Sequence, residues 1–195
     1  MSLGPAKPLA KGQGLLLHAC CGPCAGYPLG ELLGRGLDIL LYFYNPNIQP
    51  PWEYQRRRDS LAFLGALRSA PVAAPGSLSM EFAPYRPKDF LEAVGPVALS
   101  PDRCAACYRL RLRKAAETAR ERGLPAFTTT LLFSRQQKHD VIREEGGKAA
   151  KEFGVAFHYE DFRAGHKEGM RLARELGLYR QSYCGCLYGC SEGGA

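Results

Sequence analysis

Cysteine is the residue most able to do chemistry in this chain, and its eight copies fall into three tight groups. The groups are Cys20, Cys21 and Cys24 in CCGPC, Cys104 and Cys107 in CAAC, and Cys184, Cys186 and Cys190 in CGCLYGC. A C-x-x-C pair lets two thiolates converge on one metal or cluster, and thiolates favour iron–sulfur clusters or zinc over hard cations. Three groups on three loops therefore predict a metal centre.

Three simpler interpretations of the cysteines compete with a metal cluster. Structural zinc needs four thiolates in two spaced pairs, so seven or eight thiols exceed its requirement. A thioredoxin-like redox role would fall to Cys21 or Cys24, because a helix N-terminus near Cys24 would lower a thiol pKa. Cysteines also serve as small buried hydrophobes, and Cys190, beside the small-residue tail, is expected to have such an incidental role.

Cys20 and Cys21 are adjacent, and consecutive side chains of an extended backbone point in opposite directions. We expect these two thiols to serve two neighbouring centres. A four-iron cluster takes four thiolates, which leaves up to three cysteines for an adjacent iron with open coordination positions.

The composition is that of an ordinary globular protein, so the cysteines are not required as staples for folding. The chain has 195 residues, 46% of them hydrophobic and 23% charged, which fits a single domain with tails at 1–13 and 187–195. The N-terminus has no apolar segment that resembles a secretion signal, so a reducing cytoplasm is the expected location. The apolar stretch 37–44 is too short to span a bilayer, so no membrane role is expected.

Strand-like and helix-like segments alternate along the chain. Strands are expected at Gly14–Ala19, Leu37–Tyr44, Ala126–Phe133 and Val155–Phe162. Helices are expected at Gly26–Gly36, Trp52–Ser69, Phe90–Val94, Ala105–Gly123, His139–Phe153 and His166–Leu176. Tyr108–Arg113 alternates like a strand, but the helix formers that follow it favour a helix. Because parallel strands need crossover connections, we expect an α/β fold with a Rossmann-like parallel β-sheet and helices on both faces.

The segments that could do chemistry follow the predicted strands, at the edge where open α/β sheets bind ligands. CCGPC follows the first strand, NPNI follows the second, and Ser134 follows the third. Asp161 and Arg163 lie around the end of the fourth strand. We expect one site to draw on all of these segments.

Six short segments form a specific joint pattern, in unbroken order from about Leu15 to Cys186. They are HACCGPC (His18–Cys24), YNPNI (Tyr44–Ile48), CAACYRLRL (Cys104–Leu112), FTTTLLFS (Phe127–Ser134), DFR (Asp161–Arg163) and YRQSYCGC (Tyr179–Cys186). This pattern resembles the QueH-type epoxyqueuosine reductase family. The resemblance implies a fold related to nucleotide-binding ATP pyrophosphatases, and reduction of epoxyqueuosine to queuosine at the anticodon wobble position of tRNA. It also implies a [4Fe-4S] cluster and an additional mononuclear iron.

The resemblance assigns the metal ligands to seven cysteines and leaves Cys190 outside the pattern. These ligands are Cys20, Cys21, Cys24, Cys104, Cys107, Cys184 and Cys186. Removal of an epoxide oxygen as water takes two electrons, two protons and an electrophile for the oxygen. A cluster as electron conduit and an iron as Lewis acid would meet this need, with electrons supplied by an external electron donor.

Polar residues of the matched segments are candidates for the remaining chemistry. Proton delivery or substrate positioning is expected of Asp161, Arg163, Tyr179 and Arg180. A loop salt bridge is an equally supported role for Asp161 and Arg163. His18 lies inside an apolar strand and is expected to be a core histidine with satisfied hydrogen bonds.

A net charge of +7 and a pI near 9.0 make nucleic acid a candidate partner. Base or ribose contacts are expected from Tyr44, Asn45 and Asn47, for which a simple turn role is almost as well supported. Phosphate contacts are expected from two sets, Arg56, Arg57 and Arg58, and Arg109, Arg113 and Arg120 on one helical stripe. Trp52 and Tyr54 could stack on anticodon bases, but for Trp52 core packing is favoured.

Three rival functions have distinguishing features. An ATP-using enzyme of the same general fold would need a glycine-rich phosphate loop after the first strand, where CCGPC stands instead. A non-catalytic zinc-stabilised RNA-binding module would contain no iron. A dithiol oxidoreductase would keep its activity after loss of all metal.

Overall fold

A five-stranded β-sheet forms the centre of the computed structural model, which describes residues 9–69 and 75–190. The strands are β1 (Gly14–His18), β2 (Asp38–Phe43), β3 (Leu78–Phe82), β4 (Ala126–Thr129) and β5 (Ala156–Phe157). Their order is β3-β2-β1-β4-β5, and every neighbouring pair is parallel. The predicted α/β fold with a parallel sheet is confirmed. The relation to ATP pyrophosphatases stays a prediction.

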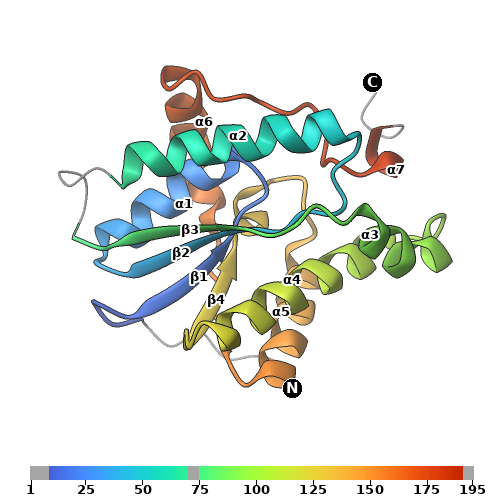
Figure 1. Cartoon of the computed structure of the whole chain (residues 1–195), viewed down its shortest axis with the longest axis horizontal. Coiled ribbons are helices and arrows are strands. Elements are labelled where there is room, and N and C mark those ends of the chain that lie inside the picture. Colours follow the sequence, from blue (N-terminus) through green and yellow to red (C-terminus); the bar gives the residue numbers. More distant parts are fainter. Residues whose placement is uncertain (1–8, 70–74, 191–195) are drawn as a thin grey trace.

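Helices cover both faces of the sheet (Figure 1). On one face α1 (Gly22–Gly34) packs against both α2 (Pro51–Arg68) and α6 (His166–Glu175). On the other face α4 (Arg103–Glu121) packs against α5 (His139–Phe153). The remaining short elements are α3 (Pro87–Val94), α7 (Leu187–Cys190) and the 3-10 turns η1 (Gly95–Val97), η2 (Thr130–Phe133) and η3 (Phe162–Gly165). Among the described helices, none is long and apolar enough to cross a membrane.

The structure describes part of each predicted tail, 1–13 and 187–195. Residues 9–13 lead into β1, and α7 occupies the start of the predicted C-terminal tail. Residues 1–8 and 191–195 lie outside the described part of the chain.

The middle strand β1 is buried along nearly its whole length. Leu15, Leu16 and Leu17 are all 0% exposed, and because neighbouring strand residues face opposite sides, β1 is covered on both faces. Burial of one such side chain contributes about 1.5–3 kcal/mol relative to exposure. The residues that directly follow β1 therefore start from a firmly held strand.

His18, the last residue of β1, is a fully buried core histidine, as predicted. Its Nδ1 lies 2.9 Å from Thr129 Oγ1, and its Nε2 lies 3.1 Å from the carbonyl oxygen of Tyr44. Burial lowers the pKa of His18 to about 3, so the ring is neutral at pH 7. These bonds join the ends of β1, β2 and β4.

The strand predictions were wrong in three places. A fifth strand, β3, was missed, although Leu78, Met80 and Phe82 alternate with polar residues. The third predicted strand ends at Thr129, because the Thr129 hydroxyl accepts a hydrogen bond from the Leu131 N–H and starts a 3-10 turn. The fourth shrinks to the two residues of β5.

The first helix begins earlier than predicted. Gly22 and Pro23 look like a turn in the sequence, but they form the first turn of α1, where proline fits because that position needs no N–H partner. The segment Tyr108–Arg113 lies in α4, so its interpretation as helix despite the alternating pattern is confirmed.

Gly146 provides a test of the packing between α5 and β5. A Cβ added at Gly146 would lie 2.5 Å from the Phe157 ring, whereas one added at Gly34, near the end of α1, would meet nothing within 4 Å. We expect Gly146→Ala to lower the free energy of unfolding by about 1–3 kcal/mol. Gly34→Ala is the matched control and should leave stability unchanged or slightly raised. Equal effects of the two substitutions in urea unfolding would contradict this packing.

Candidate metal centre and its cavity

The three cysteine groups meet at the carboxyl edge of the sheet. Cys20 and Cys21 follow β1 after one residue, Ala19, at the point where the chain crosses from one side of β1 to the other and open α/β sheets have a crevice. A cavity of about 540 Å³ lies there, and its lining includes Cys20, Cys24, Cys104, Cys107, Cys184 and Cys186. Asn47 and Ser134, from the segments after β2 and β4, line the same cavity. The expectation of one shared site is supported for these segments.

The first cysteine group is compact. The Sγ atoms of Cys20, Cys21 and Cys24 all lie within 4.8 Å of one another, which suits a shared metal. Cys21 is the N-cap of α1, and its Sγ accepts a hydrogen bond from the Cys24 N–H at 3.4 Å. The predicted divergence of Cys20 and Cys21 was wrong, since their Sγ atoms lie 3.8 Å apart. The chain turns from β1 into α1 here, so the alternation of a strand does not apply.

The second and third groups approach each other across the cavity. Cys104 and Cys107 lie in the first turns of α4, and a spacing of three places them on one helix face. Cys107 packs in a small buried cluster with Cys186, Phe90 and Val94. The Sγ atoms of Cys184 and Cys186 lie 3.6 Å apart. Two chain-distant groups thus share one wall.

Hydrogen bonds between thiols make one cysteine in each of two groups more acidic. Bonds from Cys21 and Cys24 hold the pKa of Cys20 well below its usual range, whereas burial raises the pKa of Cys21. A bond from Cys186 lowers the pKa of Cys184 to about 6, and the same contact raises the pKa of Cys186. Cys20 and Cys184 are therefore the thiolates that this arrangement favours at neutral pH.

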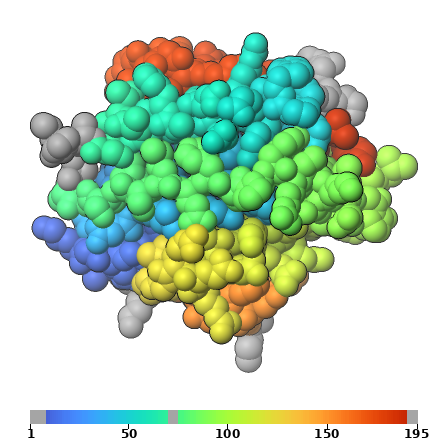
Figure 2. Space-filling view, in the orientation of Figure 1, coloured from blue at the N-terminus to red at the C-terminus, as the bar shows by residue number. Residues whose placement is uncertain are grey.

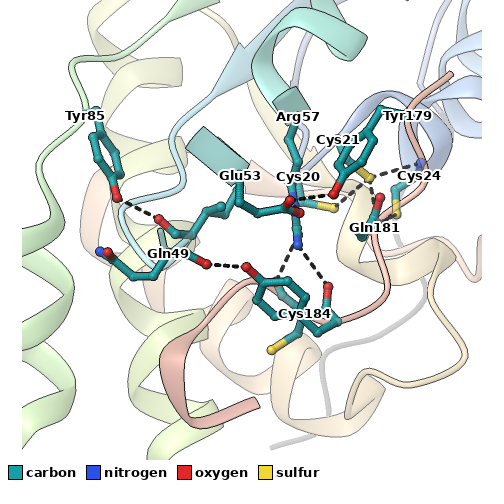
Figure 3. A network of polar contacts seen from close by, with 12 residues as sticks. Cys20, Cys21, Cys24, Gln49, Glu53, Arg57, Tyr85, Tyr179, Gln181 and Cys184 are labelled. Carbon is teal, nitrogen blue, oxygen red and sulfur yellow. Dashed lines mark hydrogen bonds and ion pairs between the residues drawn. The ribbon is translucent and has the colours of Figure 1, made fainter. Parts of the chain in front are cut away.

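Arg57 holds the third cysteine group in place. Its Nη1 donates to the carbonyl oxygen of Cys184 at 3.2 Å and its Nη2 to that of Tyr183 at 3.0 Å. Its Nε donates to Glu53 Oε1 at 2.7 Å, and both side chains of this ion pair are 1% exposed (Figure 3). Tyr179 donates its hydroxyl to the other Glu53 oxygen at 2.5 Å. The segment 179–184 is thus bound to α2 by one buried network.

Arg57 was predicted to contact RNA, and that prediction was wrong because its guanidinium is buried and bound within the protein. Sequence reasoning also missed Glu53. The signal was present in the sequence, since Glu53 and Arg57 are four residues apart on a predicted helix, the spacing of a helical ion pair.

Arg111 connects the first two cysteine groups. Its side chain is 3% exposed, and its Nη2 donates to Asn45 Oδ1 at 2.7 Å. Asn45 Nδ2 donates to the carbonyl oxygen of Ala19, directly before Cys20. Arg111 also hydrogen-bonds Cys107 and thereby acts against the rise that burial causes in the pKa of that thiol. One side chain of α4 therefore braces the loop that follows β1.

The cavity is basic. Arg57, Arg103, Arg111 and Lys138 line it, and none of its lining residues is an aspartate or glutamate within the part of the chain that the structure describes. The cations favour thiolates over thiols and also favour an anionic ligand. Gln181 lies against the first group, with its Nε2 3.0 Å from Cys21 Sγ and 3.4 Å from Cys24 Sγ.

Comparison with known proteins decides the family. A family model described as "Epoxyqueuosine reductase QueH" matches residues 15–192. The chain belongs to the QueH family. A protein of that name from Thermotoga maritima is 34% identical over 186 residues, which cover 91% of each chain. Relatives of the same name from Dehalococcoides mccartyi and Haemophilus influenzae are 33% and 31% identical, over 89% of this chain and 91% and 70% of theirs.

The resemblance predicted from the six segments is therefore confirmed, as is the class of enzyme, an oxidoreductase. The individual site residues of this QueH family member have to be judged from its own geometry. The seven predicted metal ligands lie close enough together to share one site. Six of them line one cavity, and the Cys21 Sγ lies within 4.8 Å of the Sγ atoms of two of these six.

The predicted catalytic residues have other contacts. Asp161 caps η3 and binds the Arg163 guanidinium at 2.5 Å, and both side chains are more than 40% exposed. This is the loop salt bridge that the sequence supported equally well. Arg180 is exposed, and Tyr179 is bound to Glu53. None of the four lines the cavity. The catalytic roles of Arg163, Tyr179 and Arg180 stay predictions, and the geometry of Asp161 favours a structural role.

The predicted substrate contacts divide in a similar way. Asn47 lines the cavity. Asn45 is 1% exposed, and both the nitrogen and the oxygen of its side-chain amide are hydrogen-bonded within the protein. Its backbone carbonyl oxygen accepts a turn hydrogen bond from the Ile48 N–H. Tyr44 is 5% exposed and donates its hydroxyl to Asp89. Substrate contact by Asn45 or Tyr44 stays a prediction.

Two arginines of the predicted phosphate-binding stripe join α4 to α5. Arg109 Nε lies 2.8 Å from Glu145 Oε2, and Arg113 forms an ion pair with Glu152. Both arginines are about half exposed, and neither lines the cavity. Their contact with RNA stays a prediction, and their observed role is to hold two helices together.

Arg57 allows a test of the buried network. We expect Arg57→Gln to lower the free energy of unfolding by about 3–5 kcal/mol, because Glu53 is left as an uncompensated buried charge. Arg171→Gln removes an exposed pair with Glu175 on α6 and should cost no more than about 1 kcal/mol. Replacing both Arg57 and Glu53 with apolar residues should recover much of the loss. Urea unfolding measures all three, and similar losses for the two single variants would contradict the network.

Proposed function

We propose that this chain reduces epoxyqueuosine to queuosine at the anticodon wobble position of tRNA; its relatives are named epoxyqueuosine reductases. We further propose that its cysteines hold a [4Fe-4S] cluster and an additional mononuclear iron. The observation that carries the proposal is the convergence of three cysteine groups on one basic cavity. Electrons would come from an external electron donor.

The donor set fits such a centre. The available ligands are all sulfur, and a tetrahedral zinc would use only four of them. The residues that would hold the two metals are Cys20, Cys21, Cys24, Cys104, Cys107, Cys184 and Cys186. When bound, this centre supplies the electrons and the electrophile that removal of an epoxide oxygen requires.

The remaining lining residues are suited to bind and orient a nucleotide. Asn47 Oδ1 and Gln181 Oε1 are buried and have no hydrogen-bond partner among the described residues, so they can accept hydrogen bonds from a base or a sugar. Lys138 is exposed at the cavity and can neutralise a phosphate. These groups would orient the substrate by its polar edges.

A dithiol oxidoreductase is the second candidate function, and one observation favours it. Cys184 and Cys186 lie 3.6 Å apart and have pKa values shifted in opposite directions, as in a reactive dithiol. The clustering of the other five cysteines around the same cavity favours the metal centre.

Metal analysis separates the candidates. We expect protein prepared without oxygen to contain roughly five irons and about four sulfides per chain. Cys104→Ala should lose cluster absorbance and stability, because binding free energy is also folding free energy. Cys190→Ala is the matched control, since that residue lies outside the six-segment pattern, and it should keep both. Zinc without iron would exclude the proposed centre, and full epoxyqueuosine reduction by metal-free protein would favour the dithiol.

Asp161 tests where proton delivery takes place. Because its carboxylate binds Arg163 outside the cavity, we expect Asp161→Asn to change single-turnover reduction of epoxyqueuosine by only about two-fold. A catalytic acid or base would instead slow the reaction by roughly 100-fold or more. Asparagine keeps an oxygen that can cap η3, so the variant loses only the exposed ion pair with Arg163 and should be destabilised by no more than about 1 kcal/mol.

A further inference from the structure

A large aromatic side chain stands exposed beside the metal-binding region. Trp52, in the first turn of α2, is 59% exposed, so the predicted core packing of Trp52 was wrong. The Arg56 guanidinium lies over two rings, 5.5 Å from the Trp52 centroid and 5.4 Å from the Tyr179 centroid. We call these three side chains the Trp52–Arg56–Tyr179 stack. Figure 2 shows the start of α2, in cyan, at the surface next to α7, in red.

One member of the stack, Tyr179, has a fixed orientation. Tyr179 is bound through its hydroxyl to buried Glu53, and Glu53 is bound to buried Arg57 (Figure 3). Arg57 in turn binds the backbone at Cys184. A rigid aromatic surface loses little conformational freedom when a ligand binds. The exposed faces of the stack are therefore prepared for contact.

The stack adjoins the cavity without forming part of its lining. Arg57, directly after Arg56, lines the cavity, and so does Gln181, two residues after Tyr179. The three members of the stack do not. A molecule with one group in the cavity would therefore place its adjoining groups near the stack.

Charge and ring chemistry indicate the kind of molecule. Arg56 and Arg180 are exposed cations, and Glu53, the carboxylate that contacts the stack, is 1% exposed and paired with Arg57. An aromatic face beside arginines binds an unstacked base together with its phosphate, because every base has a π-face and every nucleotide has a charge. An acidic or purely apolar partner would use only half of these features.

We propose that the Trp52–Arg56–Tyr179 stack docks an unpaired anticodon-loop nucleotide adjacent to the reacting base. This rests on the proposed function, since it takes tRNA as the substrate. The cavity would receive the reacting base, and the stack would bind its neighbour by base stacking on Trp52 and by the Arg56 charge. The surface thus contributes affinity for the loop, and the metal-binding cavity is left to the modified base.

Tryptophan emission monitors the proposed contact directly, because Trp52 is the single tryptophan of the chain. The metal-loaded protein is titrated with tRNA that carries epoxyqueuosine, while tryptophan emission and RNA anisotropy are recorded together. We expect emission to change along the same binding curve as anisotropy. Binding seen by anisotropy with unchanged emission would overturn the stacking proposal and leave the proposed function intact.

Three variants separate stacking from general attraction. Trp52→Ala should weaken tRNA binding roughly ten-fold, and Trp52→Phe should restore most of it. Phe63→Ala is the matched control, since Phe63 is 50% exposed and eleven residues, about three turns, further along the same face of α2. Phe63→Ala should leave binding unchanged.

The results distinguish the two proposals. Equal binding by Trp52→Ala and the parent protein, both with normal iron content and turnover, would overturn only the docking surface. Absence of both tRNA binding and epoxyqueuosine reduction in the metal-loaded parent would overturn the proposed function and the surface with it. Unchanged melting temperatures of the Trp52 and Phe63 variants would show that their folding is intact.

Discussion

A single buried guanidinium holds the C-terminal cysteines against the rest of the molecule. Arg57 is 1% exposed and would be costly to bury alone, but its N–H groups reach Glu53 and the carbonyl oxygens of Tyr183 and Cys184. A planar guanidinium presents several donors in fixed directions, which a lysine could not do. The last cysteine group therefore takes its position from α2, an element more than a hundred residues away in the sequence.

A second arginine acts in the same way on the opposite wall. Arg111 braces the loop after β1 through Asn45 and contacts Cys107 on its own helix. Thiolates gathered around one cavity would repel each other strongly in a medium of low dielectric constant. Two buried cations among them offset this repulsion, so the same residues that fix the geometry also make the charge of the site tolerable. Geometry and electrostatics cannot be changed separately here.

The sequence predicted most of the elements and the cysteine site, because both depend on local or joint patterns. Periodicity placed β1, β2, α4 and α5, and the six segments predicted the family. Side-chain partners were less predictable. Arg57 and Trp52 belong to the same helix, but Arg57 is buried and Trp52 is exposed, the reverse of the prediction. A helical pattern does not say which turn of the helix contacts the segment 179–184. Asp161 and Arg163 were candidates for proton delivery or substrate positioning, but they form an ion pair on the surface.

The order of the cysteines along the chain constrains how the site is assembled in a cell. The first group lies at residues 20–24 and the third at 184–186, close to opposite ends of the sequence. At usual rates of synthesis the ribosome would complete the third group on the order of ten seconds after the first. For the first part of that interval β1 lacks β4, its neighbour in the sheet, and until its end the early thiols have no partner cysteines from the C-terminal segment. Any metal that needs all three groups is therefore loaded onto a finished chain rather than a nascent one.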